Sequence, residues 1–151
     1  MNLDIIRNGD VEPTEIEDLR EAVGWERCEG TYASILKRHY TYYTVRAQDG
    51  SLIGYVSVLS DGISDAFLLD LMVHPSAQRT HIGMRLVERA IQDMKDAGVR
   101  CIQVTFNEDL QEFYAKCGFH IFGGGIIDFK KMDWNAGRQP GHPGDGERPR
   151  R

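Results

Sequence analysis

The sequence predicts a single α/β (α+β) domain, in which about four helices flank a mixed β-sheet of about seven strands. Its 151 residues, 41% of them hydrophobic, suffice for one compact core and are too few for two. Amphipathic segments alternate with runs of β-branched and aromatic residues, which is typical of helices and strands packed as layers. Residues 66–106 read as strand, helix and strand, which predicts a parallel, right-handed unit at the centre of the fold.

The N-terminal part predicts one strand and two helices. Residues 3–7 (LDIIR) form a short apolar run that suits a first strand. The next segment, PTEIEDLREAVG, has Pro13 and acidic residues at its start and Gly24 at its end, which is a helix signature. In residues 31–40 apolar side chains recur on one face, which indicates a second amphipathic helix.

A hairpin and a buried strand follow. Residues 41–47 and 51–60 are rich in β-branched and aromatic residues, and the sequence QDG between them is a strong tight-turn signal. Residues 66–74 (AFLLDLMVH) are almost continuously apolar, as expected for a strand that is covered on both faces near the centre of a sheet. Asp70 is the only charged residue inside this strand.

The clearest helix spans residues 80–97, because its apolar positions form a helical stripe and Gly98 supplies a C-terminal stop. A strand over residues 100–106 and a short helix over residues 108–118 come next. Residues 119–132 then predict two strands joined by the glycine triplet. That triplet precedes a strand, whereas a nucleotide-binding fingerprint requires a helix, so we interpret it as a hairpin or a bulge.

Composition restricts the classes of function. The net charge is −5 and the pI about 5.5, so no global basic field attracts nucleic acid or an anionic membrane. The N-terminus resembles no signal peptide, and no apolar run is long enough to cross a membrane. The odd number of cysteines suits reduced thiols. These observations favour a cytoplasmic protein. Five scattered histidines suggest no metal site. We expect a folded domain over residues 1–134 and a disordered polar tail over residues 135–151.

The polar turn between the buried strand and the long helix is the first candidate site. A helix that begins directly after a strand leaves its first backbone N–H groups without intrahelical partners, and the helix dipole adds positive charge there. Arg79, His81 and Arg85 can add more, so a phosphate or pyrophosphate is the natural ligand. Gly83 allows the backbone to approach it closely.

Two motifs resemble those of the GNAT (GCN5-related N-acetyltransferase) superfamily. LMVHPSAQRTHIGMRL is similar to its acetyl-CoA-binding motif V-x-P-x-x-[QR]-x-x-G-x-[GA], in which Pro75, Gln78 and Gly83 match in order and spacing. VTFNEDLQEFYAKCGF resembles its second signature, an Asn that ends a strand and a helix with a Tyr followed by Gly-Phe. Together the matches span about half of the chain, and the predicted order of elements coincides with that fold.

The resemblance implies an N-acetyltransferase that uses acetyl-CoA as co-substrate. It would transfer the acetyl group to a primary amine, which attacks the thioester directly. It implies pantetheine binding by the backbone of Leu71, Met72 and Val73, which would splay from the neighbouring strand, and by Asn107. It places the pyrophosphate on a turn that consists of Gln78, Arg79, Thr80, His81, Ile82, Gly83 and Met84. It also implies that Tyr114 is the acid that protonates the departing thiolate.

His81 stands where the family usually has its first glycine. A histidine at positive φ carries a steric penalty, whereas in the helical region it costs little and places a titratable donor near phosphate. We expect the helical conformation at His81.

The general base is less determined. A carboxylate inside a central strand is costly unless it is paired or used, so Asp70 is our candidate. The alternatives are ordered water and the rival residues His74, Asp65, Glu108 and His120. The first two helices, the connection from Asp61 to Asp65 and the final hairpin would shape the acceptor pocket. It would be lined by Trp25, Tyr32, Tyr40 and Asp65.

Three other matters stay open at this point. The donor could be a longer acyl-CoA, or the chain could be a noncatalytic acyl-CoA-binding or regulatory module. A homodimer through the edge of the last strands is possible, and the identity of the acceptor amine is unknown.

Overall fold

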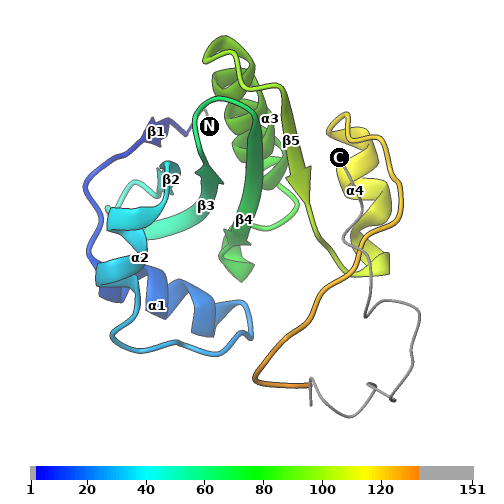
Figure 1. The fold of residues 1–151 in the computed structure, drawn as a ribbon. Helices are drawn as coiled ribbons and strands as arrows, with labels where there is room; N and C mark the ends of the chain where they lie inside the picture. Colours follow the sequence, from blue (N-terminus) through cyan, green and yellow to red (C-terminus); the bar gives the residue numbers. More distant parts are fainter. Residues whose placement is uncertain (1–2, 133–151) are drawn as a thin grey trace. The chain divides into compact units, whose positions relative to one another are not determined.

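The computed structural model describes residues 3–132, and all of its helices and strands lie within residues 3–121 (Figure 1). One sheet has the order β1-β2-β3-β4-β5, antiparallel except for the parallel pair β4 and β5. The strands are β1 (Ile5–Arg7), β2 (Thr41–Arg46), β3 (Leu52–Ser60), β4 (Asp65–Val73) and β5 (Cys101–Val104). The helices are α1 (Pro13–Ala22), α2 (Tyr32–Arg38), α3 (Ile82–Asp96) and α4 (Gln111–Lys116).

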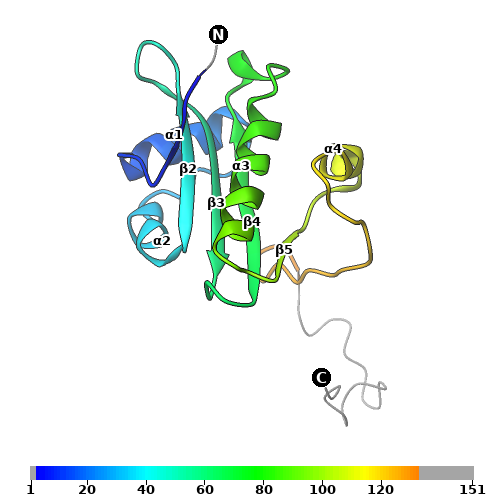
Figure 2. The same cartoon turned by 90° about the horizontal axis from the view of Figure 1, so that it is seen from above.

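The sheet separates two hydrophobic cores. On one face α1 and α2 pack on Leu52, Tyr55 and Met72, and on the other α3 packs on a larger cluster that includes Tyr43 and Val56. Figure 2 shows α3 lying along β3 and β4. The predicted stripe supplies the buried face of α3: Ile82, Leu86, Val87, Ala90 and Met94 are all buried, as the helical spacing requires.

A β-bulge interrupts β4. Tyr55 of β3 pairs with Met72, but Ser57, two residues on, pairs with Leu69, so β4 contains one extra residue. Asp70 has a φ of 55°, the left-handed conformation that Asp tolerates better than most residues. The bulge therefore turns the Asp70 side chain toward α1 and α2, whose residues it contacts.

The edge between β4 and β5 is only partly paired. The register runs from the pair Asp65 and Cys101 to the pair Leu68 and Val104, where β5 ends. β4 continues to Val73 without a β5 partner. This is the splay that the sequence resemblance implied.

Within residues 3–132, four helices and the β2–β3 hairpin confirm the prediction, but the sheet has five strands and not seven. Residues 119–132 form no strand, and Phe122, Ile126 and Phe129 are exposed. The three glycines supply no side chains for cross-strand contacts and lose much entropy when ordered, which explains why the local pattern was misleading. β4 is the fourth of the five described strands, and it is not covered on both faces throughout, because α1 and α2 pack near Met72 and leave Asp65 and Phe67 exposed at its other end.

The predicted boundary between residues 134 and 135, and the tail beyond it, lie outside the described residues. Among residues 3–132, no helix combines the length and the apolar character needed to span a membrane.

Candidate active site

The turn before α3 differs from the prediction in its backbone. α3 begins at Ile82, and His81, its N-cap, has a φ of 64°, so the expected helical conformation at His81 is wrong. Arg79 is also left-handed, with a φ of 63°. The chain leaves β4 through the short 3₁₀ turn Pro75–Ala77 and must reverse sharply to enter the helix, which explains the two unusual residues.

The first turn of α3 keeps its N–H groups available. No side chain among the described residues caps it, and the first backbone bond closes from the N–H of Arg85 to the carbonyl of His81. His81, Arg79 and Thr80 are exposed, whereas Ile82 is buried and anchors the turn. The side-chain amide of Gln78 donates to the carbonyl of Val73 at 3.1 Å and ties the turn to the end of β4. The result is an uncapped, positive helix end beside an open strand.

Gly83 occupies a position where the fold does not require glycine. Its φ is not positive, and an added Cβ would meet Val73 at 3.5 Å and Phe113 at 3.7 Å, which are ordinary contacts. A glycine inside a helix costs about 1 kcal/mol relative to alanine. Neither packing nor backbone conformation explains that cost.

Backbone donors line the open edge of β4. The N–H of His74 donates to the carbonyl of Ile53 on β3 at 2.8 Å. Because backbone N–H directions alternate along a strand, those of Leu71 and Val73 point to the opposite edge, beyond the end of β5. The Met72 side chain is buried against α1 and α2 and only holds the strand in place. Asn107 lies just after β5 and is exposed.

Asp70 is held by two side chains from the helices. The hydroxyl of Tyr32 donates to Oδ2 of Asp70 at 2.7 Å and accepts from Nη1 of Arg20 at 3.0 Å. The same Nη1 lies 3.6 Å from Oδ1, and the Asp70 side chain remains 26% exposed. Burial is the main cause that raises the pKa of Tyr32, so its hydroxyl stays protonated as the donor. The carboxylate is thus oriented and still accessible.

Two buried polar atoms without hydrogen-bond partners lie in the electrostatic field of Asp70. They are Nδ1 of His39 and the hydroxyl of Tyr55, and within residues 3–132 they alone have this status. Burial lowers the pKa of His39 and raises that of Tyr55, so both groups are neutral.

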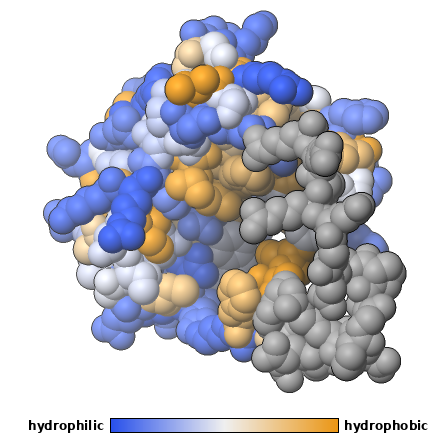
Figure 3. Space-filling view, in the orientation of Figure 1, coloured by the Kyte–Doolittle hydropathy of each residue, from blue (hydrophilic) through white to orange (hydrophobic). Residues whose placement is uncertain are grey.

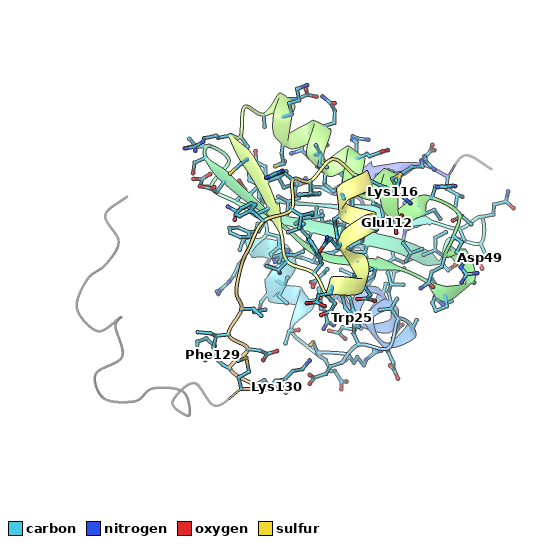
Figure 4. All side chains as sticks on the ribbon, turned by 90° about the vertical axis from the view of Figure 1, so that its right-hand side faces the viewer. Trp25, Asp49, Glu112, Lys116, Phe129 and Lys130 are labelled. Carbon is cyan, nitrogen blue, oxygen red and sulfur yellow. The ribbon has the colours of Figure 1, made fainter. Side chains whose placement is uncertain are left out.

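Tyr114 is both a core residue and a candidate acid. Its ring stacks on Phe106 at 5.0 Å and meets Phe113 and Phe119 edge-on. Burial raises its pKa to about 12, which keeps the phenol protonated. Glu112 and Lys116 form an exposed ion pair of 2.9 Å on α4 (Figure 4). Phe113 and Tyr114 lie on the other side of this helix and pack in the core. Phe113 of this helix lies near Gly83, where an added Cβ would be 3.7 Å from its ring.

The other candidates are spread over the domain. Asp65 lies at the start of β4, where Cys101 and Gln103 donate to it at 2.9 and 3.2 Å. Trp25, in the loop after α1, packs on the Arg20 guanidinium at 5.2 Å. His74 Nδ1 contacts the hydroxyl of Ser76 at 2.7 Å, and Glu108 and His120 are exposed. Sequence reasoning missed Arg20, His39 and Tyr55, because their relation to Asp70 depends on long-range folding.

Comparison with known proteins adds a family match. The model of the Acetyltransferase (GNAT) family matches residues 8–119. The chain is 29% identical over 137 residues to histone acetyltransferase TAP1 of Glycine max, covering 83% of this chain and 58% of the relative. It is 25% identical over 146 residues to the chloroplastic GCN5-related N-acetyltransferase 2 of Arabidopsis thaliana, covering 83% and 55%. The chain thus spans little more than half the length of these relatives.

Solved structures have the same architecture. A GNAT family acetyltransferase protein from Streptococcus pneumoniae TIGR4 superposes with a TM-score of 0.71 and 27% identity, covering 84% of this chain and 98% of that one. AAC(6')-Iy, solved in complex with the bisubstrate analog CoA-S-monomethyl-acetylneamine, has a TM-score of 0.67 at 17% identity, covering 85% and 97%. The second likeness is one of fold alone.

Proposed function

The chain belongs to the acetyltransferase (GNAT) family, and from this premise we propose that it transfers an acetyl group from acetyl-CoA to a primary amine of a small molecule or peptide. The observation that carries the proposal is the uncapped first turn of α3 beside the unpaired end of β4. The first turn of α3 suits a diphosphate, and the edge of β4 that has no β5 partner suits a thioester.

The pyrophosphate of acetyl-CoA binds at the turn of residues 78–84. The N–H groups of Ile82, Gly83 and Met84 are the orphan donors of the first helical turn, and Gly83 leaves space for the phosphate oxygens. Arg79, Thr80 and His81 are exposed around this turn. Arg79 and His81 add hydrogen-bond donors near the anion. Gln78 keeps the turn against β4.

The pantetheine arm and the thioester follow the splay between β4 and β5. The N–H groups of Leu71 and Val73 point into this opening, where one of them stabilises the oxyanion of the tetrahedral intermediate. Asn107, at the end of β5, contacts the pantetheine arm. These main-chain donors are held rigidly because β4 pairs with β3 on its other side, so they need little reorganisation during the reaction.

The reaction is a direct displacement. The neutral amine nitrogen attacks the thioester carbonyl carbon and forms the C–N bond, after which the C–S bond breaks. The proton lost by the amine passes to Asp70 directly or through ordered water, and the Tyr114 hydroxyl supplies the proton of the free thiol. The high pKa of Tyr114 keeps that proton available. No covalent enzyme intermediate is needed.

The test is thiol release joined to a binding measurement. Purified protein is titrated with CoA by calorimetry, and acetyl-CoA is offered with polyamines, amino acids, aminoglycosides and peptide N-termini. We expect saturable CoA binding and amine-dependent free thiol. CoA binding without thiol release from any amine would identify a noncatalytic acyl-CoA-binding module, and no CoA binding would refute the proposal altogether. A panel of longer acyl-CoA donors separates acetyl from other acyl groups.

The cytoplasmic location remains a prediction, because some relatives are named chloroplastic. The homodimer and the lack of nucleic-acid and membrane partners also remain predictions.

A further inference from the structure

A pocket of about 530 Å³ lies at the outer edge of the sheet, where Ile6 of β1 pairs with Thr44 of β2. Both residues line it, together with Gly9 and Asp10 of the loop after β1, and we call it the β1–β2 pocket. In the sheet order β3 separates β2 from β4, so the β1–β2 pocket is not part of the candidate active site.

Hydrogen bonds fix the loop that forms one wall of the β1–β2 pocket. The hydroxyl of Tyr42 donates to the carbonyl of Gly9 at 2.8 Å. Nη2 of Arg46 donates to the carbonyl of Asp10 at the same distance of 2.8 Å. A side chain at Gly9 would meet Cγ2 of Ile6 at 2.8 Å, so glycine allows the loop to lie directly against β1. The pocket is therefore formed before a ligand arrives, as most ligand sites are.

Thr44 contributes a hydroxyl that has no partner. The residue is only 2% exposed, it lines the β1–β2 pocket, and its side chain makes no hydrogen bond within residues 3–132. Tyr43 and Val45 on either side of it are buried in the α3 core, so the Thr44 side chain points to the opposite face of the sheet. Its Oγ1 would lie 3.1 Å from an added Cβ at Gly9, which also lines the pocket. Because buried polar groups are normally hydrogen-bonded, this hydroxyl indicates a site for a polar ligand.

Two carboxylates give the β1–β2 pocket a net negative charge. Asp4 and Asp10 line it, and both residues are exposed. Among the described residues of the lining, Arg46 is the other charged one, and its Nη1 and Nη2 donate to the carboxylate of Glu15 at 2.7 and 2.8 Å. The hydrogen bond from Arg46 lowers the pKa of Glu15, so Glu15 stays ionised and neutralises Arg46. The charges of Asp4 and Asp10 therefore remain to attract a cation.

Apolar side chains complete the lining. They belong to Leu3, Ile6 and Ala47, and Ile6 is 50% exposed. Hydrophilic residues predominate around the edge of the coloured surface in Figure 3. An apolar wall beside two carboxylates suits a ligand with two parts, a cation and an alkyl chain whose methylene groups cover the apolar wall.

We propose that the β1–β2 pocket is a second ligand site, which binds a guanidinium group carried on a short alkyl chain. A guanidinium has five N–H donors in one plane and accepts no hydrogen bond, which matches a set of acceptors made of two carboxylates and a hydroxyl. The alkyl chain packs on Leu3 and Ile6. Arginine has this chemistry, both as a free molecule and as a side chain of a peptide.

The test uses n-butylguanidinium, which has the cation and the alkyl chain but stays protonated at neutral pH and so is no acetyl acceptor. Calorimetry measures its Kd for the full chain, alone and saturated with CoA. We expect saturable binding in both states. n-Butylurea has nearly the same shape without the charge, and it should bind at least about tenfold more weakly.

Substitutions in the β1–β2 pocket make the test specific. Asp4→Asn and Asp10→Asn should each raise the Kd of n-butylguanidinium about tenfold, because each removes one charge-assisted acceptor. Thr44→Val keeps the shape of the side chain, loses the hydroxyl and should raise the Kd about threefold. Asp96→Asn is the matched control, since it removes an exposed carboxylate at the end of α3, and it should leave the Kd unchanged. Thermal unfolding of each variant confirms that it folds.

The outcomes separate this site from the acceptor pocket of the active site. Absence of binding, equal binding of n-butylurea, or binding that survives both aspartate substitutions would overturn the inference. Affinity that is lost in Asp70→Asn and kept in Asp4→Asn and Asp10→Asn would place the probe beside Asp70 and overturn it as well. None of these measurements depends on thiol release, so a failure of the proposed acetyl transfer would leave the result unaffected.

Two further probes identify the source of the guanidinium. They are N-acetylarginine amide and the peptide Gly-Arg-Gly with blocked ends. Tighter binding of the peptide supports an arginine side chain of a protein partner as the ligand, and equal or weaker binding of the peptide supports a free small molecule.

Discussion

Tyr32 donates a hydrogen bond of 2.7 Å to Asp70, although 38 residues separate them in the chain. The bond joins α2 to the bulge of β4, and Arg20 of α1 supports it from the other side of the hydroxyl. Both helices of one face therefore fix the carboxylate that we assign to the amine. This contact makes the orientation of Asp70 testable separately from its charge.

Tyr32→Phe should lower kcat about tenfold and the free energy of unfolding by about 1 kcal/mol, because Asp70 loses one of its donors. Tyr42→Phe is the matched control: its ring also packs on Tyr55, and its hydroxyl donates to the carbonyl of Gly9 at 2.8 Å. It should lose similar stability and keep kcat. In an Asp70→Asn background, Tyr32→Phe should have little further effect on kcat, and additive losses would argue against the positioning role.

Tyr114→Phe should lower kcat about 100-fold and leave the Kd of CoA within about twofold, because the ring keeps its stack on Phe106 and only the proton donor is lost. Steady-state kinetics and calorimetry on the same preparations measure both effects. Unchanged kcat would assign Tyr114 to the core alone.

The pH profile of the wild-type protein tests the same residue independently. An ordinary tyrosine is half ionised near pH 10, but the pKa of Tyr114 is raised to about 12 by burial. The protonated acid therefore persists, and kcat should show no descending limb between pH 8 and 10. A fall with a midpoint near pH 10 would contradict Tyr114 as a buried acid.

Gly83→Ala should separate folding from cofactor binding. The fold has room for the methyl group, so the free energy of unfolding should stay equal or rise by about 0.5–1 kcal/mol. The Kd of CoA should rise about tenfold or more, because the methyl group stands where the phosphate approaches. Gly123→Ala, with no atom within 4 Å of its added Cβ, is the control and should change neither quantity much. A Kd of CoA that is unchanged or lower in Gly83→Ala would contradict the phosphate site at this turn.

His39 should make the protein less stable in acid. Burial lowers the pKa of His39 below its ordinary value of 6.5, so the unfolded chain binds a proton that the folded chain does not. The stability that His39 contributes is present above pH 6.5 and is lost as the pH falls through the folded pKa. Thermal unfolding of wild type and His39→Gln between pH 5 and 7.5 measures this, and the variant should show the shallower pH dependence. Parallel curves would contradict it.

Local sequence signals predicted much of the fold. The QDG turn lies between β2 and β3 of the hairpin, and the apolar stripe from Ile82 to Met94 forms the buried face of α3. The first family motif predicted the position of the turn at residues 78–83, and the second singled out Tyr114. These features depend on residues a few positions apart, which a sequence displays directly.

Features that depend on distant contacts could not be predicted. The partners of Asp70 come from α1 and α2, and no spacing in the sequence brings Arg20 or Tyr32 to it. The conformation of His81 depends on how the 3₁₀ turn enters α3, and the side chain alone allowed either region. The two expected strands in residues 119–132 had suitable apolar residues, but the glycine triplet between them disfavours strand conformation.

The extra residue at Asp70 also decides which substitutions and which deletions β4 can accept. Phe67 and Met72 are five positions apart and would face opposite sides in a regular strand, yet here both face α1 and α2. Removing the extra residue would leave Phe67 and Met72 four positions apart, on one face of a regular strand, so Leu68 and Leu71 would keep facing α3 while the bulge and its carboxylate would be lost. We expect a chain without Asp70 to fold with a regular β4 and to lose acetyl transfer.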